Sequence, residues 1–542
     1  MRGRMMAFPL TVPALLRRTD TFWRDREVVS RAADRSVVRT TYGATLRRAR
    51  QLAVGLRRAG IRSGDRVATL CWNHLPHLEA YFGIPLAGAV VHTLNLRLHP
   101  GDLGYIASHA EDAVVIVDAS LAPLFTQFRE HIPDARVIVV GASGSEAERL
   151  VPGAIDYETF IAGANADDYA DEVTDEHAAA AMCYTSGTTG RPKGVLYSHY
   201  AICLHAMAVA QTLGLRQHDT ILPIVPMFHA NAWGLPYASA MLGARFVLPG
   251  PFMDPASVLE LLSSERATFA AGVPTIWSGI AQALDAAPGR YDLSSLKGIL
   301  CGGSAVPPSM IEMYERKYGV RIFQAWGMTE TSPLATAATV ETHFEGLTPA
   351  ERYTLAAKQG WAVPNVELRI MTPEGEAPRD GRTMGEIEVR GPWIASGYYK
   401  DDAPDRFSPD GWFRTGDIAT LDPTGCVQIQ DRVKDLIKSG GEWISSVALE
   451  SALVAHPAVA EAAVVAIPDD RWQERPLALV VLRPGASVTP EDLRAFLAPQ
   501  FAKWWLPDGF VVVESLPRTP TGKLLKYQLR EKYQNYKAAA IG

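Results

Sequence analysis

The feature that most constrains the fold is an alternation of amphipathic and short apolar segments between about residues 40 and 270. A helix-like stretch, YGATLRRARQLAVGLRRAG, is followed by the apolar runs DRVATLCW, AVVHTLN and DAVVIVD. Such an alternation is typical of βα units with largely parallel strands. We therefore expect an α/β fold whose large N-terminal domain contains parallel αβαβα-type sheets.

The pattern changes near Gly385. The stretches GEIEVRG, GWFRTGDIATLD and CVQIQDR consist of short apolar runs separated by Gly, Asp and Pro, which predicts a β-rich subdomain. The segment DRVKDLIKSGGEWIS (431–445) is charged and contains paired glycines. Such a segment is typical of a flexible linker between two domains, and we call it the crossing.

A small α+β unit is predicted beyond this crossing. SSVALESALVAHP is helix-like, EAAVVAIPD and LALVVLRP are strand-like, and Thr489 and Pro490 provide an N-cap and a first helical position. We therefore divide the chain into an N-terminal domain (1–431), a hinge (432–434) and a mobile C-terminal domain (435–542).

The composition limits the classes of partner. A chain of 542 residues is too long for one compact core. Its formal charge of −6 gives no positive electrostatic field that would attract nucleic acid. The five cysteines are scattered and form no CxxC pair, which disfavours disulfides and zinc and favours a cytoplasmic protein. No run reaches the roughly 20 apolar residues of a membrane span, although peripheral membrane contact stays open.

The stretch YTSGTTGRPKGV (184–195) has the chemistry of an anion site. Its glycines allow backbone N–H groups to turn inward, and its hydroxyls and Lys193 add donors and a cation. By composition alone it is equally a polar surface turn. It is not a Walker loop, because Gly194 and not Ser or Thr follows the lysine.

The residue order in YTSGTTGRPKG resembles the phosphate-loop signature of the adenylate-forming enzymes, which comprise acyl-CoA synthetases, peptide-synthetase adenylation domains and luciferases. Five more stretches resemble landmarks of that family in the same order: PMFHANAWG (226–234), FQAWGMTE (323–330), RTGD (414–417), DRVKDLIKSGGEWIS (431–445) and PRTPTGK (517–523). The resemblance covers nearly the whole chain and implies ATP, Mg²⁺ and CoA as cofactors or co-substrates.

The resemblance also implies roles for single residues. Trp326 would pack on adenine, and Asp417 would accept hydrogen bonds from the ribose hydroxyls. Lys523 would bridge the substrate carboxylate and the α-phosphate. The expected catalytic residues are Lys523, Glu330, Thr185 and His229, and the expected metal ligands are Thr185 and Glu330. The expected nucleotide- and CoA-binding residues are Thr185, Ser186, Gly187, Thr188, Thr189, Lys193, Gly302, Gln324, Ala325, Trp326, Gly327, Thr329, Asp417, Arg432, Lys434, Lys438, Trp443 and Lys523.

The acyl site is expected around PMFHANAWG. Amino-acid-activating relatives usually carry an aspartate in this segment, and its absence favours an uncharged acyl tail. Trp233 falls where long-chain enzymes of the family have an acyl gate, although core packing would also explain it. The expected substrate-binding residues are His229, Asn231, Trp233, Gly302, Gly303, Pro333, Gly440 and Gly441.

Relatives first form acyl-AMP and pyrophosphate and then rotate the C-terminal domain so that a thiol attacks the adenylate. Lys434 occupies the hinge position, and residues 439–443 would line the pantetheine tunnel. The stretches FAKWWLP and PDDRWQERPLA resemble those of medium- and long-chain fatty acid–CoA ligases and equally those of the related methylthiopropanoate-CoA ligases. The expected activity is that of a medium- or long-chain fatty acid–CoA ligase, with a small-molecule carboxylic acid as substrate.

Other activities stay open at this point. They are a methylthiopropanoate- or other short-chain acid–CoA ligase, an acyl-AMP ligase that loads a carrier protein, a luciferase-like oxygenase, and a nucleotide sensor. Some relatives are homodimers, so a homodimer is also among the expected assemblies.

Overall fold

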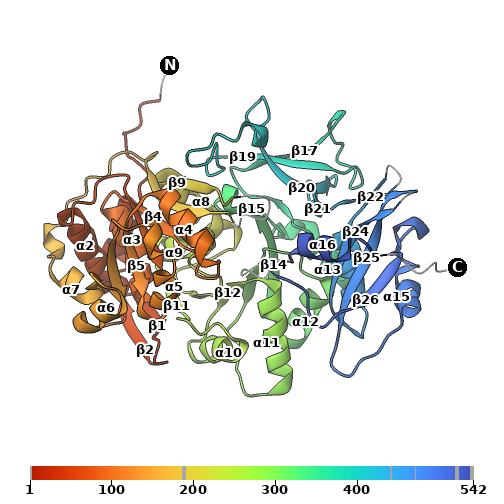
Figure 1. The fold of residues 1–542 in the computed structure, drawn as a ribbon, viewed down its shortest axis with the longest axis horizontal. Coiled ribbons are helices and arrows are strands. Elements are labelled where there is room, and N and C mark those ends of the chain that lie inside the picture. Colours follow the sequence, from red (N-terminus) through yellow and green to blue (C-terminus); the bar gives the residue numbers. More distant parts are fainter. Residues whose placement is uncertain (1–2, 186–190, 440–441, 470, 519–523, 537–542) are drawn as a thin grey trace.

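The structure is a computed structural model that describes residues 3–185, 191–439, 442–469, 471–518 and 524–536. Figure 1 shows the N-terminal elements on the left, strands β17 and β19 at the top and the C-terminal elements on the right. Four sheets organise the described residues.

The first sheet has seven strands in the order β7-β6-β5-β3-β4-β8-β9. All neighbours are parallel except β8 and β9. The three apolar runs quoted above form β3, β4 and β5, which confirms the predicted βα units. The strands are β3 (Arg66–Leu70), β4 (Val90–Thr93), β5 (Asp112–Asp118), β6 (Arg136–Val140), β7 (Ile155–Asp156), β8 (Ala179–Tyr184) and β9 (Gly194–Ser198).

The second sheet has nine strands in the order β16-β15-β14-β13-β12-β10-β11-β1-β2. The strands from β14 to β1 run parallel, whereas β2, β15 and β16 are antiparallel to their neighbours. The N-terminal strand β1 therefore joins a sheet that later residues build. The strands are β1 (Glu27–Arg31), β2 (Val37–Thr41), β10 (Thr220–Pro223), β11 (Arg245–Leu248), β12 (Phe269–Gly272), β13 (Gly298–Cys301), β14 (Arg321–Gly327), β15 (Leu334–Ala337) and β16 (Trp361–Ala362).

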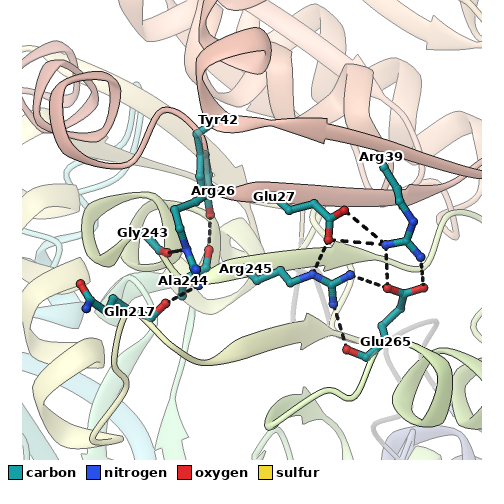
Figure 2. Close-up of polar contacts among 9 residues, drawn as sticks. All are labelled: Arg26, Glu27, Arg39, Tyr42, Gln217, Gly243, Ala244, Arg245 and Glu265. Carbon is teal, nitrogen blue, oxygen red and sulfur yellow. Dashed lines mark hydrogen bonds and ion pairs between the residues drawn. The ribbon is translucent and has the colours of Figure 1, made fainter.

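A network of charges fastens β1 and β2 to this sheet, as Figure 2 shows. Arg245 on β11 lies between Glu27 of β1, at 2.6 Å, and Glu265. Arg39 of β2 also contacts Glu265, with 2.9 Å between Nη2 and Oε1. The Glu265 side chain is only 4% exposed. Because a buried charge is costly unless it is paired, these two arginines are needed to compensate the negative charge of its carboxylate.

Helices cover the sheets, and α2 packs against α3 and α7. Ser198 caps α8, since its hydroxyl accepts a hydrogen bond from the Ala201 N–H at 3.1 Å. The helices are α1 (Val12–Phe22), α2 (Tyr42–Arg58), α3 (Leu75–Leu86), α4 (Pro100–Ala110), α5 (Ala122–Thr126), α6 (Gly144–Leu150), α7 (Tyr157–Ala162), α8 (His199–Thr212), α9 (Leu235–Leu242), α10 (Pro255–Ser264), α11 (Pro274–Ala286), α12 (Pro308–Tyr318), α13 (Pro349–Ala356), α14 (Ser446–Val454), α15 (Pro490–Leu497) and α16 (Lys526–Tyr533).

The third sheet is antiparallel, in the order β18-β17-β19-β20-β21, and it confirms the β-rich subdomain. The strands are β17 (Glu367–Thr372), β18 (Gly375–Glu376), β19 (Gly385–Arg390), β20 (Phe413–Leu421) and β21 (Val427–Arg432).

The fourth sheet lies in the C-terminal part with α14, α15 and α16. Thr489 caps α15 by accepting from the Asp492 N–H at 3.1 Å, and Pro490 is the first helical residue, as predicted. The strands are β22 (Ile437–Ser439), β23 (Glu442–Ile444), β24 (Val459–Asp469), β25 (Gln473–Leu482) and β26 (Gly509–Val512).

The segment 431–445 differs from the expected crossing, because its described residues include the antiparallel pair β22 and β23. Ile437 and Ile444 face each other in this pair and are both fully buried. Burial of two apolar side chains favours regular pairing over an open linker.

A buried polar cluster joins β21 to the C-terminal helices. Asp431 accepts hydrogen bonds from the backbone N–H of Ser446, at 2.8 Å, and from its hydroxyl. Lys526 of α16 donates to the Ser446 hydroxyl at 2.5 Å and pairs with Glu450 at 2.7 Å. Each buried charge thus has a partner, and the cluster holds α14 and α16 against the end of β21.

These sheets confirm the predicted fold class, a mixed α/β protein with parallel sheets in its large N-terminal part and a smaller C-terminal α+β part. All five cysteines are buried and free. In the ranges that the structure describes, no helix is long and apolar enough to cross a membrane. The domain boundaries at 431 and 434 stay predictions.

Candidate functional site

The phosphate-loop candidate leaves the seven-stranded sheet between β8 and β9. The Thr185 N–H donates to the Lys193 carbonyl at 2.9 Å, and the Lys193 N–H donates to Thr185 Oγ1 at 3.1 Å. These bonds close the stem of the loop. Four expected phosphate-binding residues lie outside the described residues, namely Ser186, Gly187, Thr188 and Thr189.

The Lys193 side chain is fixed by two groups from one later segment. Its Nζ forms an ion pair with Asp401 at 2.8 Å and lies 4.9 Å from the ring centre of Tyr398. The ion pair lowers the pKa of the Asp401 carboxyl, chiefly through the hydrogen bond from Lys193. The lysine is half-buried and keeps an exposed side.

Glu330 lies in a short 3₁₀ turn (Thr329–Thr331) that follows β14. Its carboxyl group is buried, and Oε1 accepts a hydrogen bond from the Tyr398 hydroxyl at 2.7 Å. The neighbouring Thr329 carbonyl accepts from the hydroxyl of Tyr197 on β9 at 2.8 Å. The loop stem on β9 and the acidic turn after β14 are therefore joined across two sheets.

The expected adenine and ribose residues are in direct contact. The Trp326 indole N–H donates to Asp417 Oδ2 at 2.8 Å, and Arg432 Nε lies 3.2 Å from Oδ1. Asp417 and Arg432 are paired across strands β20 and β21, whereas Trp326 comes from β14. The fold thus brings a buried aromatic ring, a buried carboxylate and a guanidinium to one place.

Close backbone packing surrounds Trp326 on β14. Gln324 is buried, and its Oε1 accepts from the Val306 N–H at 3.0 Å. A Cβ on Gly327 would lie 1.7 Å from the Pro333 carbonyl oxygen, so only glycine fits there. A Cβ on Gly302 would lie 3.0 Å from the carbonyl of Ala325. Gly302 is buried, and the adjacent Gly303 is exposed.

The acyl-site candidate is a left-handed turn, η4 (Ala230–Gly234), in which all five residues have positive φ. Such a run is costly outside glycine and indicates that the surrounding structure fixes it. It places the half-buried Trp233 beside Gly302, since Cη2 would lie 3.6 Å from a Cβ there. Asn231 points into the core instead, where its Oδ1 accepts from Tyr81 at 3.3 Å.

Two histidines border this turn. His229 is half-buried and precedes it. His205 is fully buried on α8, and burial lowers its pKa to about 3, so it is a neutral acceptor for the Leu334 N–H at 3.2 Å. A Cβ on Gly234 would lie 2.5 Å from His205 Nδ1, which explains the glycine at the end of the turn.

The expected CoA and hinge residues lie in or next to the C-terminal sheet, and Lys434 is close enough to Asp417 and Arg432 for their charges to act on its ammonium group. Lys438 and Trp443 are opposite each other across β22 and β23, and Lys434 is exposed before them. Gly440, Gly441 and Lys523 lie outside the described residues. The roles of all these positions stay predictions.

Sequence reasoning missed Tyr398 and Asp401, which contact Glu330 and Lys193. Their segment, SGYYKDD, has no helical or strand periodicity, and nothing in its spacing indicates partners so distant in the chain. The Tyr398 pKa is raised by burial and then by the nearby Glu330 charge, so the hydroxyl keeps its proton and remains a donor.

Comparison with known proteins gives two family matches. The model described as AMP-binding enzyme matches residues 16–399, and the one described as AMP-binding enzyme C-terminal domain matches residues 448–523.

Several curated proteins are similar over almost their full length. A long-chain-fatty-acid–CoA ligase of Thermus thermophilus is 49% identical, covering 99% of each chain. A medium-chain-fatty-acid–CoA ligase of Ectopseudomonas oleovorans is 45% identical, covering 98% of each. A 3-methylmercaptopropionyl-CoA ligase of Ruegeria lacuscaerulensis is 42% identical, covering 99% of each. Among solved structures, ATP-bound MatB from Rhodopseudomonas palustris has a TM-score of 0.82 at 27% identity, covering 98% of this chain and 100% of that one.

Proposed function

Because this chain belongs to the AMP-binding enzyme family, we propose that it is an ATP-dependent fatty acid–CoA ligase for medium- or long-chain acids. Two relatives at 49% and 45% identity carry that activity in their names. The observation that carries the proposal is the contact of Trp326, Asp417 and Arg432 beside the turn that holds Glu330.

This contact fits a nucleoside. An aromatic ring offers a stacking surface for a base, and a carboxylate accepts hydrogen bonds from two neighbouring hydroxyls. The backbone stem at Thr185 and the Lys193 ammonium are suited to the phosphate chain. The proposed nucleotide site thus runs from Trp326 past Glu330 to the loop between β8 and β9.

The residues present fit Mg²⁺ held together with phosphates. In the described ranges no three His, Cys, Asp or Glu side chains form a metal site of their own. Mg²⁺ typically uses one or two carboxylates plus phosphates and waters, and Glu330 with the Thr185 hydroxyl provides such an oxygen set. When bound, the ion would neutralise charge on the phosphates.

The proposed reaction has two steps. A carboxylate oxygen of the acid bonds to the α-phosphorus of ATP, the bond to the bridging oxygen breaks, and pyrophosphate leaves with that electron pair. The thiol of CoA then loses its proton and attacks the acyl carbon, and AMP leaves. In the first step two anions approach each other, so Lys193 and Lys523 would stabilise the charge in the transition state.

We also propose that the acid lies near Trp233 and Gly302. The ring of this half-buried tryptophan and a glycine without a side chain leave an apolar boundary at that point, and no carboxylate among the expected substrate residues would bind an ammonium group. This environment suits an uncharged acyl tail.

Pyrophosphate release measured over a panel of acids tests the function. We expect release with octanoate to palmitate, dependent on ATP and followed by acyl-CoA formation. Release with methylthiopropanoate alone would support the activity named for the Ruegeria relative. Release without thioester formation from free CoA would indicate a carrier protein as acceptor, and no release with any acid would contradict the proposal. A cytoplasmic location and a homodimer stay predictions.

A further inference from the structure

One short segment contacts both candidate phosphate-handling groups. We call residues 393–401 the strap. Near its start, the Trp393 carbonyl accepts from the Ser332 hydroxyl at 2.7 Å, and the Ala395 N–H donates to the Glu330 carbonyl at 2.8 Å. Further along, the Tyr399 N–H donates to the carbonyl of Gly194, just after the phosphate loop, at 2.8 Å. The strap therefore spans from the acidic turn to the loop stem.

Tyr398 lies between these attachment points and uses two different parts of its side chain. Its hydroxyl donates to Glu330 Oε1 at 2.7 Å, and its ring lies 4.9 Å from Lys193 Nζ. The residue is 8% exposed, so both interactions are shielded from water on the tyrosine side. One side chain thus contacts both the Glu330 carboxylate, which follows β14, and the Lys193 ammonium, which precedes β9 of another sheet.

The choice of oxygen matters for the chemistry. Because Oε1 accepts a hydrogen bond from the Tyr398 hydroxyl, rotation of the Glu330 carboxyl group is restricted. The direction of its second oxygen, Oε2, is restricted with it. Groups that orient a ligating carboxylate in this way are typically worth about 10- to 100-fold in metal affinity or activity. A cation near an aromatic face gains about 0.5–1 kcal/mol at a partly exposed site, which corresponds to about a 2- to 5-fold change in affinity.

We propose that Tyr398 is a positioning residue for the adenylation step: its hydroxyl orients Glu330 toward the cation on the nucleotide phosphates, and its ring orients Lys193 toward the phosphates themselves. This inference rests on the proposed function. It assigns no direct contact between Tyr398 and the reacting atoms.

The strap does not need the Tyr398 hydroxyl to stay in place. The bonds at Trp393, Ala395 and Tyr399 involve backbone groups, and the Trp393 indole donates to the Leu334 carbonyl at 3.0 Å. Tyr398→Phe is therefore expected to fold normally. Tyr399→Phe is a matched control on the same strap, because its hydroxyl contacts Glu111 at 3.4 Å and neither Glu330 nor Lys193 in any described contact.

The test measures ATP affinity by calorimetry, with and without Mg²⁺, and pyrophosphate release with a fatty acid. For Tyr398→Phe we expect the gain in ATP affinity from Mg²⁺ to fall about 10-fold and release to slow by a similar factor. Its Mg²⁺-free affinity should stay within about twofold of the wild type. Tyr398→Leu should also lower the Mg²⁺-free affinity, by about 2- to 5-fold.

The outcomes separate this inference from the proposed function. If the wild type releases pyrophosphate and Tyr398→Phe keeps both the Mg²⁺ gain and the rate, the inference is wrong and the function stands. Equal losses in Tyr398→Phe and Tyr399→Phe would also overturn it, since they would indicate general damage to the strap. A wild type without ATP-dependent release would contradict the function itself.

Discussion

At the scale of single residues, the hydrogen bond between Trp326 and Asp417 gives a direct prediction for nucleotide binding. Trp326→Phe keeps an aromatic surface but removes the N–H that donates to Oδ2 at 2.8 Å. The variant removes the donor that orients the Asp417 carboxylate for the ribose hydroxyls. Because a hydrogen bond to a charged group is worth about 1.5–3 kcal/mol, loss of this orientation should weaken ATP binding by up to about tenfold. Calorimetric titration with ATP measures this change.

Trp361→Phe is the control for this variant. Trp361 is also 8% exposed, and its indole N–H donates to the Thr424 carbonyl at 3.2 Å, away from the expected nucleotide residues. It should lose an indole hydrogen bond to a neutral carbonyl without a change in ATP affinity. If both variants bind ATP like the wild type, the role of the Trp326 indole in positioning Asp417 for the nucleotide is contradicted.

Gly327 gives a second prediction at this scale, for stability. Its missing side chain allows β14 to approach the Pro333 carbonyl, where a Cβ would be only 1.7 Å from the oxygen. Gly327→Ala should therefore force the backbone apart and destabilise the fold by about 3 kcal/mol. Gly397→Ala has open space around its Cβ and should stay within about 0.5 kcal/mol of the wild type in urea unfolding.

At the scale of elements, Glu265 links β2 and β11 and predicts a pH dependence. Burial works to raise its pKa, but the hydrogen bonds and charges of Arg39 and Arg245 outweigh it and lower the pKa. A lowered carboxyl pKa stabilises the fold above the unfolded value of about 4.3, and this stabilisation is lost as the pH falls through the folded value.

Glu265→Gln should therefore cost about 2 kcal/mol at neutral pH, and the difference from the wild type should shrink below about pH 4. Urea unfolding midpoints at a series of pH values measure both effects. Glu260→Gln is the control, because Glu260 is 45% exposed and lies 3.4 Å from its partner Arg31. A constant difference at all pH values would show that packing, not charge, explains the loss.

The elements differ in how far sequence predicts them. Strands β3, β4 and β5 were predictable because parallel strands buried on both faces are continuous apolar runs. Strands β22 and β23 were not, since their buried apolar pair, Ile437 and Ile444, lies in a segment that is otherwise largely charged or polar. The left-handed turn at Trp233 could not be predicted either, because distant packing and not local propensity holds its positive φ values.

The candidate site likewise contains residues that the sequence predicts and residues that it does not. Trp326, Asp417 and Glu330 were predicted through ordered motifs that resemble a family, and composition alone left the phosphate loop ambiguous. Tyr398 was missed because its hydrogen bond spans 68 residues and its segment has no periodicity. A contact of that kind exists only once the sheets are assembled.

At the scale of the whole molecule, the described contacts cross the predicted hinge. Asp431 lies before the hinge and Ser446 after it, and the backbone N–H of Ser446 donates to the carboxylate at 2.8 Å. Rotation of the C-terminal part about residues 432–434 would have to break this bond or carry Asp431 along. The free-energy difference between the present arrangement of the C-terminal part and a rotated one therefore depends in part on this buried cluster.

The two proposed steps, acyl-AMP formation and thioester formation, are expected to use different arrangements of the N- and C-terminal domains. One substitution should therefore impair one step and not the other. Lys523 is expected to act only while acyl-AMP forms, where its charge would offset two anions. Lys523→Ala should slow pyrophosphate release at least about 100-fold, yet leave thioester formation from supplied acyl-AMP and CoA nearly intact. Lys532→Ala, an exposed lysine on α16, is the control and should change neither rate. Since a lysine needed for folding or for acyl binding would impair both steps alike, equal losses for Lys523→Ala would refute a role confined to adenylation.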